Sequence, residues 1–288
     1  MTAGIPATCI VRAAVDGWAA EELRTLTQNT ALPPTAVHRP ASAERAALSA
    51  GSRHVRERAA AARPGQPIPV HFVDDMSDVI AHDTFANSRL SALTEMALLE
   101  RLWQSMASPA NLSNIAADVD VTADTVTRHV GYLRDAFLLR GCPQRADDFW
   151  LPRDRAQDKP YAVDPVVARL AHLRNPERRD IDPTVLTEMQ IGMAVRRRIL
   201  ADRPRSSTDE SLFYVRTASR KEIDFVAADL AGVAVEAKYT EGGRWLREAQ
   251  TVNASEWNGI LAARDVLVTD GPGAWAVPAA FLAYAADT

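Results

Sequence analysis

From about residue 85 onward, apolar positions follow the period of an α-helix in three successive segments. The first and third segments repeat at i, i+4, i+7 and i+11, and a shorter helix is predicted between them over residues 111–119. Thr122 is a candidate N-cap of the third helix. The apolar positions are Ala92, Met96, Leu99 and Trp103 in the first helix, Leu112, Ile115 and Ala116 in the second, and Val126, Val130, Leu133 and Phe137 in the third.

A short turn at residues 120–122 joins the second and third of these helices, which is a helix-turn-helix pattern. Strand-like segments follow at 137–140, 149–151 and 159–163. Two helices followed by such segments predict a winged helix, with the later segments completing the wing.

The outer surface of the third predicted helix is a candidate DNA-binding surface. It carries Thr125, Arg128 and Tyr132 opposite the apolar stripe, and we expect these residues to contact DNA. Asp124 and Asp135 lie on the same surface, and acidic side chains weaken binding to phosphate. A three-helix packing module that does not touch DNA is therefore the alternative interpretation.

A carboxylate interrupts the apolar face of a fourth helix, which is predicted to begin at Pro183. Glu188 shares one face of this helix with Gly192, Val195 and Ile199. Because a charge on an apolar stripe needs a partner, Glu188 is a candidate functional residue.

Three strands are predicted after this helix, at residues 213–216, 222–227 and 233–238. A three-residue loop at 229–231 would join the last two in a hairpin, with Gly232 free to adopt a positive φ. Two later strands are predicted at 265–269 and 275–278.

The hairpin register places Asp224 opposite Glu236 and Glu222 opposite Lys238. Directly opposed carboxylates repel, and a bound cation offsets the repulsion. Carboxylate oxygens suit Mg²⁺ or Mn²⁺, so we expect Glu188, Asp224 and Glu236 to hold the metal. Lys238 would assist the attacking water, which makes Asp224, Glu236 and Lys238 the candidate catalytic residues for phosphodiester hydrolysis. The alternative is a solvated strand face on which Lys238 pairs with Glu222.

Composition narrows the function classes. A chain of 288 residues, 47% hydrophobic and 24% charged, is typical of a globular protein of about two domains. The formal net charge is -4, so DNA would bind only at local basic patches. The two cysteines form no metal-ligand pattern, and no segment predicts a signal peptide or a membrane span. We therefore expect a cytoplasmic protein without membrane contact.

Lysine is rare in this chain: of 33 basic residues only Lys159, Lys221 and Lys238 are lysines. Such exceptions favour a specific need for an ammonium group. Eight basic residues accompany three acidic ones between residues 191 and 221, an excess that suits a phosphate backbone. Within this segment Arg216, Arg220 and Lys221 are candidate DNA-binding residues.

The order of a helix with Glu188, a strand with Asp224 and a hairpin ending in Glu236-Ala237-Lys238 resembles the PD-(D/E)xK nuclease superfamily. More closely, residues from about 90 to 288 resemble the C-terminal region of a family of bacterial and archaeal AAA-type ATPases. In that family a winged helix precedes a restriction-endonuclease-like domain. The matching segments are 125–128, 133–139, 159–164, 186–188, 214–216, 221–225, 235–238 and 276–279.

The resemblance implies an α/β protein with three parts. Residues 1–85 would form a helical or irregular segment that resembles the remnant of an ATPase lid, and 86–165 a winged helix-turn-helix. Residues 166–288 would form a nuclease-like domain with a mixed sheet flanked by helices. The family's ATPase core is absent, since no glycine is followed directly by lysine and no phosphate-binding loop exists. We therefore expect no ATP site and no ATPase activity in this chain.

The sequence thus predicts a DNA-binding protein with a Mg²⁺-dependent (or Mn²⁺-dependent) phosphodiesterase site of the deoxyribonuclease type. Two alternatives stay open. One is an inactive module that binds DNA or a partner protein, and the other is a regulatory fragment that works with a separate ATPase.

Overall fold

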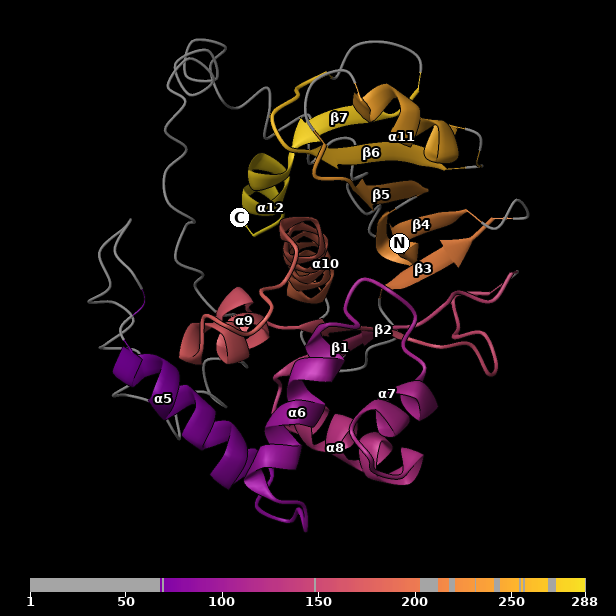
Figure 1. Ribbon diagram of the computed structural model, residues 1–288. Helices are drawn as coiled ribbons and strands as arrows, with labels where there is room; N and C mark the ends of the chain where they lie inside the picture. The colour runs from indigo at the N-terminus through magenta and orange to yellow at the C-terminus, as the bar shows by residue number, and fades with distance from the viewer. Residues whose placement is uncertain are drawn as a thin grey trace. The chain divides into compact units, whose positions relative to one another are not determined.

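The computed structural model describes residues 68, 70–147, 149–202, 212–217, 221–230, 232–240, 244–253, 255, 257–268 and 273–287. These residues form an α/β protein of two compact units (Figure 1). The helical unit holds the described residues up to Cys142 together with 157–189. The sheet unit holds 143–156 and those from Gln190 onward. Most of the predicted N-terminal segment 1–85 lies outside the described residues.

The helical unit begins with helices that pack around a small hairpin. Its elements are α5 (Val70–Asp78), the π-helical turn η1 (Val79–Thr84), α6 (Ala92–Trp103), α7 (Leu112–Asp118), α8 (Ala123–Asp135), β1 (Leu139–Cys142), β2 (Lys159–Ala162), α9 (Pro165–Arg174) and the start of α10 (Pro183–Asp202). Strands β1 and β2 pair antiparallel. Helix α9 packs against α5 and α6, which draws it into this unit although the sequence placed the boundary at residue 165.

The three helices predicted from apolar spacing are confirmed as α6, α7 and α8. The predicted cap is confirmed too, since the Thr122 hydroxyl accepts a hydrogen bond from the Thr125 N–H at 3.2 Å. The buried face of α6 is rotated from the expected one, because Ala92 is exposed. Buried side chains from these helices are Leu98, Leu99, Leu102, Trp103, Ile115, Val126 and Leu133.

Phe137 departs from the prediction that it continues the apolar stripe of α8. The helix ends at Asp135, and Phe137 adopts a positive φ of 58°. Its N–H bonds to the Arg134 carbonyl, a left-handed helix ending in which glycine is usual. Phe137 is 42% exposed, and its ring lies 4.7 Å from the guanidinium carbon of Arg140, so it shields a buried cation instead of entering the core.

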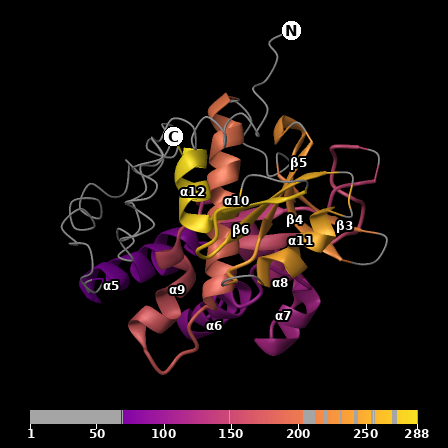
Figure 2. The same ribbon diagram turned by 90° about the horizontal axis from the view of Figure 1, so that it is seen from above.

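A five-stranded mixed sheet forms the centre of the sheet unit, in the order β3-β4-β5-β6-β7. Strands β3 to β5 are antiparallel neighbours, and β5 to β7 run parallel. Helix α11 packs against β6 and α12 against β7 (Figures 1 and 2). The elements are β3 (Phe213–Arg216), β4 (Glu222–Val226), the 3-10 turn η3 (Ala228–Leu230), β5 (Val233–Ala237), α11 (Trp245–Asn253), β6 (Asn258–Ala263), β7 (Trp275–Pro278) and α12 (Ala279–Asp287).

The hairpin register predicted from loop length is confirmed. Phe225 pairs with Val235 and Val226 with Ala234. Gly232 takes the expected positive φ, at 85°. A loop of that length therefore fixed which residues of β4 and β5 face each other.

The predicted wing strand at 149–151 is not formed. The described residues of 143–156, which are all but Asp148, instead make a loop, here called the tongue, that belongs to the sheet unit. The Tyr214 N–H donates to the Pro143 carbonyl at 3.0 Å, which joins the tongue to β3. Trp150 packs against Phe213 and Trp257. These aromatic contacts hold Trp150 against the sheet unit in place of the wing strand predicted there.

The strand predicted at 265–269 is also wrong, and a strand was missed at β6. Val268 makes only an isolated bridge with Ala276, and Thr269 lies outside the described residues. Strand β6 lies between β5 and β7, and its last four residues are all buried, so it shows no polar alternation. The strand contains Gly259, a residue type that usually disfavours strands. A Cβ at this position would lie 2.2 Å from Val252 Cγ1, so the packing of helix α11 requires the glycine.

Among the described residues, no helix is both long enough and apolar enough to cross a bilayer.

We predict that Gly192→Ala destabilises the protein although alanine favours helices. A Cβ at Gly192 would lie 2.6 Å from Phe225 Cζ, because α10 packs directly on that ring. The expected loss in urea denaturation is about 1–3 kcal/mol, against an intrinsic gain of about 1 kcal/mol. Gly131→Ala in α8 is the matched control, since nothing lies within 4 Å of its added Cβ. Equal effects of the two substitutions would contradict the packing.

Candidate functional site

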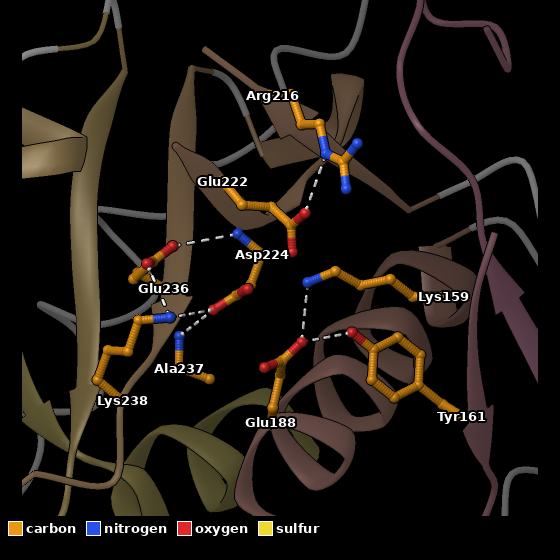
Figure 3. A network of polar contacts seen from close by, with 9 residues as sticks. All are labelled: Lys159, Tyr161, Glu188, Arg216, Glu222, Asp224, Glu236, Ala237 and Lys238. Carbon is orange, nitrogen blue, oxygen red and sulfur yellow. Dashed lines mark hydrogen bonds and ion pairs between the residues drawn. The ribbon is translucent and has the colours of Figure 1, made fainter. Parts of the chain in front are cut away.

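The candidate site lies next to the backbone pairing of β4 and β5, where side-chain carboxylates accept hydrogen bonds from the opposite strand. The Asp224 N–H donates to Glu236 Oε2 at 3.1 Å, and the Ala237 N–H donates to Asp224 Oδ2 at 3.0 Å. Each carboxylate therefore accepts from the backbone of the opposite strand, as Figure 3 shows. Both acids are 2% exposed, so the fold fixes two carboxylates side by side in a low-dielectric place.

Lys238 supplies the positive charge that this pair requires. Its ammonium Nζ lies 3.2 Å from Asp224 Oδ2 and 3.0 Å from Glu236 Oε1. The side chain is 27% exposed, whereas each carboxylate side chain is 3% exposed. The lysine thus reaches from solvent to both acids. The structure pairs Glu222 with Arg216 at 3.3 Å, so Lys238 serves the acids of the candidate site, unlike in the solvated-face interpretation.

The environment shifts the protonation of Glu236. Burial, followed by the negative charge of Asp224, raises the pKa of Glu236 from its usual 4.5 to about 7, although Lys238 opposes the shift. Near neutral pH Glu236 therefore gains or loses its proton readily. A carboxylate with a pKa in this range is a recognised feature of functional sites.

Glu188 is buried and accepts hydrogen bonds from two side chains of strand β2. It belongs to the helical unit, where its Oε1 accepts from Lys159 Nζ at 3.0 Å and from the Tyr161 hydroxyl at 2.6 Å (Figure 3). Lys159 is completely buried. The expectation that Glu188 needs a partner is confirmed, and the partners are the lysine and tyrosine of strand β2.

The structure brings Asp224, Glu236 and Lys238 together, as predicted. Within the described part of the chain, no group of three or more His, Cys, Asp or Glu side chains is arranged to hold a metal ion. Coordination of one ion by Glu188 together with Asp224 and Glu236 thus stays a prediction. The hairpin pair by itself fits a hard divalent cation, because its donors are anionic oxygens and a cationic group already lies against both of them.

The candidate DNA-binding residues of α8 lie on a surface with balanced charge. Arg128 pairs with Asp124 at 2.6 Å, and both side chains are largely exposed. The Thr125 hydroxyl lies 2.9 Å from that of Thr122, and the Tyr132 ring packs on His129. A DNA phosphate would compete with Asp124 for Arg128, so this helix alone offers modest attraction.

The other candidate DNA contacts lie beside β4. Arg216 and Lys221 are both exposed, and Arg216 bonds to Glu222. Arg220 lies outside the described residues.

The partners of Glu188 are the functional-site feature that sequence reasoning missed. The rarity of lysine singled out Lys159, and an apolar helix face singled out Glu188. No rule of sequence spacing predicts that a residue on a strand pairs with one on a distant helix, so the structure was needed to find this pair.

Comparison of the chain with family models, with curated proteins and with solved structures finds no match.

We predict that Lys159→Met lowers stability by about 3–5 kcal/mol, because it leaves the buried Glu188 carboxylate without its ammonium partner. Adding Glu188→Gln to this variant removes the buried negative charge and should restore much of the loss. Urea denaturation of single and double variants measures both effects. Lys221→Met, at an exposed lysine, should change stability by less than about 0.5 kcal/mol. A double variant no more stable than Lys159→Met would contradict the ion pair.

We also predict that the metal-free protein loses stability between about pH 4.5 and pH 7. The folded protein keeps a proton on Glu236 over this range while the unfolded chain releases it, so stability is complete below the lower pKa and is lost through the upper one. The expected loss is on the order of 2–3 kcal/mol. Urea denaturation in EDTA at pH 5 and pH 8 measures it. Glu236→Gln should flatten the curve, and parallel curves for the two proteins would refute the assignment.

Proposed function

We propose that this protein acts on DNA through a Mg²⁺-dependent phosphodiesterase site built on Asp224, Glu236 and Lys238. The observation that carries the proposal is the placement of two buried carboxylates on adjacent strands with one ammonium between them. Metal-dependent hydrolysis of a phosphodiester uses oxygen ligands for the metal and a cation near the phosphate, and these three residues offer both.

Each residue has a distinct role in this proposal. Asp224 and Glu236 would hold the metal ion, with Glu188 as the expected third ligand. A bound Mg²⁺ lowers the pKa of a water molecule and offsets negative charge on the phosphate. Lys238 orients the attacking water and stabilises the charge that builds up on the phosphate oxygens as the new P–O bond forms and the bond to the leaving oxygen breaks.

The element order supports the finer fold assignment made from the sequence. Helix α10, strands β3 to β5, helix α11 and strand β6 follow one another as the resemblance to a restriction-endonuclease-like domain implies. Asp224 lies on the second of these strands and Glu236 on the third. In the helical unit, α6 to α8 followed by the β1–β2 hairpin have the order of a winged helix. The proposed relationship to AAA-type ATPases without their ATPase core rests on the same segments.

DNA contact is proposed for two surfaces. Thr125, Arg128 and Tyr132 would meet DNA at α8, and Arg216 and Lys221 would meet the backbone near β4. Arg220 is included in this second set on the basis of the sequence.

A second candidate is a catalytically inactive module that binds DNA or a protein, including a separate ATPase. The observation in its favour is that Lys238 already forms ion pairs with both acids, so that a cation is present at this place without a metal. The experiment below separates the two candidates.

We predict that the protein cleaves plasmid or linear DNA in the presence of Mg²⁺ or Mn²⁺ but not EDTA. Glu236→Ala should lower the rate at least about 100-fold, as expected when a group that binds the catalytic metal is lost. Glu248→Ala, which removes an acid on α11 outside the site, should cleave at the wild-type rate. Equal rates for wild type and Glu236→Ala would exclude catalysis here and favour the inactive module.

A further inference from the structure

Lys238 lies where a bound cation would be expected. Its ammonium lies 3.2 Å from a carboxylate oxygen of Asp224 and 3.0 Å from one of Glu236. The ammonium therefore lies within ion-pair distance of both carboxylates. Lys238 therefore already reduces the repulsion between the acids.

A divalent ion and this ammonium compete for the same pair of carboxylates. The ammonium already takes up one oxygen of each acid, and two cations at the same pair repel each other at short range. Asp224 and Glu236 are held by backbone hydrogen bonds from the opposite strand, so the acids cannot swing away. The flexible, partly exposed lysine is the member of the trio that can move.

We propose that Lys238 is the resident counter-ion of the Asp224–Glu236 pair, and that a divalent metal binds well only when a DNA phosphate draws the ammonium out. This inference rests on the proposed function and adds to it that metal and phosphate bind cooperatively. The phosphate accepts the N–H bonds that Lys238 gives up, and the vacated oxygens become metal ligands. By linkage, the metal raises affinity for the phosphate by the same factor.

The proposal predicts that removing the lysine strengthens metal binding. Calorimetric titration with Mn²⁺ in the absence of DNA should show at least about tenfold tighter binding to Lys238→Met than to wild type, because the competing cation is gone. Lys238→Arg keeps a cation there and should bind Mn²⁺ as weakly as wild type. Arg247→Met is the matched control, since it removes one exposed positive charge from α11 in the same unit. Its Mn²⁺ affinity should equal that of wild type.

The cooperative arm uses a phosphorothioate-linked duplex oligonucleotide, which resists cleavage. This duplex should tighten Mn²⁺ binding to wild type but not to Lys238→Met, after subtraction of binding to the oligonucleotide alone. A methylphosphonate-linked duplex of the same sequence lacks the charge and should have no effect. If Lys238→Met fails to fold, as judged by circular dichroism, the wild-type comparison of the two duplexes decides the question.

The outcomes separate this inference from the proposed function. Two results would overturn the counter-ion role: Mn²⁺ binding to Lys238→Met that is no tighter than to wild type, or a wild-type Mn²⁺ affinity that the charged duplex does not change. Neither result would contradict DNA cleavage. Tight Mn²⁺ binding to Lys238→Met that Glu236→Gln abolishes, in a wild-type protein that never cleaves DNA, supports the counter-ion role and removes the nuclease. Absence of Mn²⁺ binding in every variant overturns both.

Discussion

The sharing of one ammonium by two buried carboxylates is the constraint on which the sheet unit depends. Asp224 and Glu236 come from adjacent strands and cannot separate, because each accepts a backbone hydrogen bond from the other strand. Their repulsion in a buried place would oppose closure of the hairpin without Lys238. The same closeness that makes the pair costly makes it reactive toward cations and protons. Structure and candidate chemistry therefore come from one arrangement.

The helical unit also contains a buried carboxylate that pairs with a lysine. Glu188 is offset by Lys159 and by the Tyr161 hydroxyl, and Lys159 is completely buried. Lys238 is partly exposed, so solvent reaches one ammonium and not the other. This difference in access explains why we assign chemistry to the hairpin pair. Two of the three lysines in an arginine-rich chain thus neutralise buried acids, a task suited to a compact point charge.

Local rules predicted much of the fold and of the site. Apolar spacing found α6 to α8 and α10, and the loop before Gly232 set the register that brings Asp224 to Glu236. Features that depend on distant packing could not be read from the chain. Strand β6 is a buried apolar run without alternation, and its position depends on β5 and β7. The Glu188 partners likewise lie on another element.

The tongue belongs to the sheet unit although it interrupts the helical unit in the sequence. It is inserted between β1 and β2 of the helical unit, yet Trp150 packs on aromatic residues of the sheet unit that are synthesised much later. Because Phe213 and Trp257 follow the tongue in the chain, Trp150 cannot make these contacts until both residues have been synthesised. A fragment cut at a single point would carry this loop without its binding surface. Separate expression of the helical unit therefore calls for a short bridge from Cys142 to Gln157 in place of the tongue.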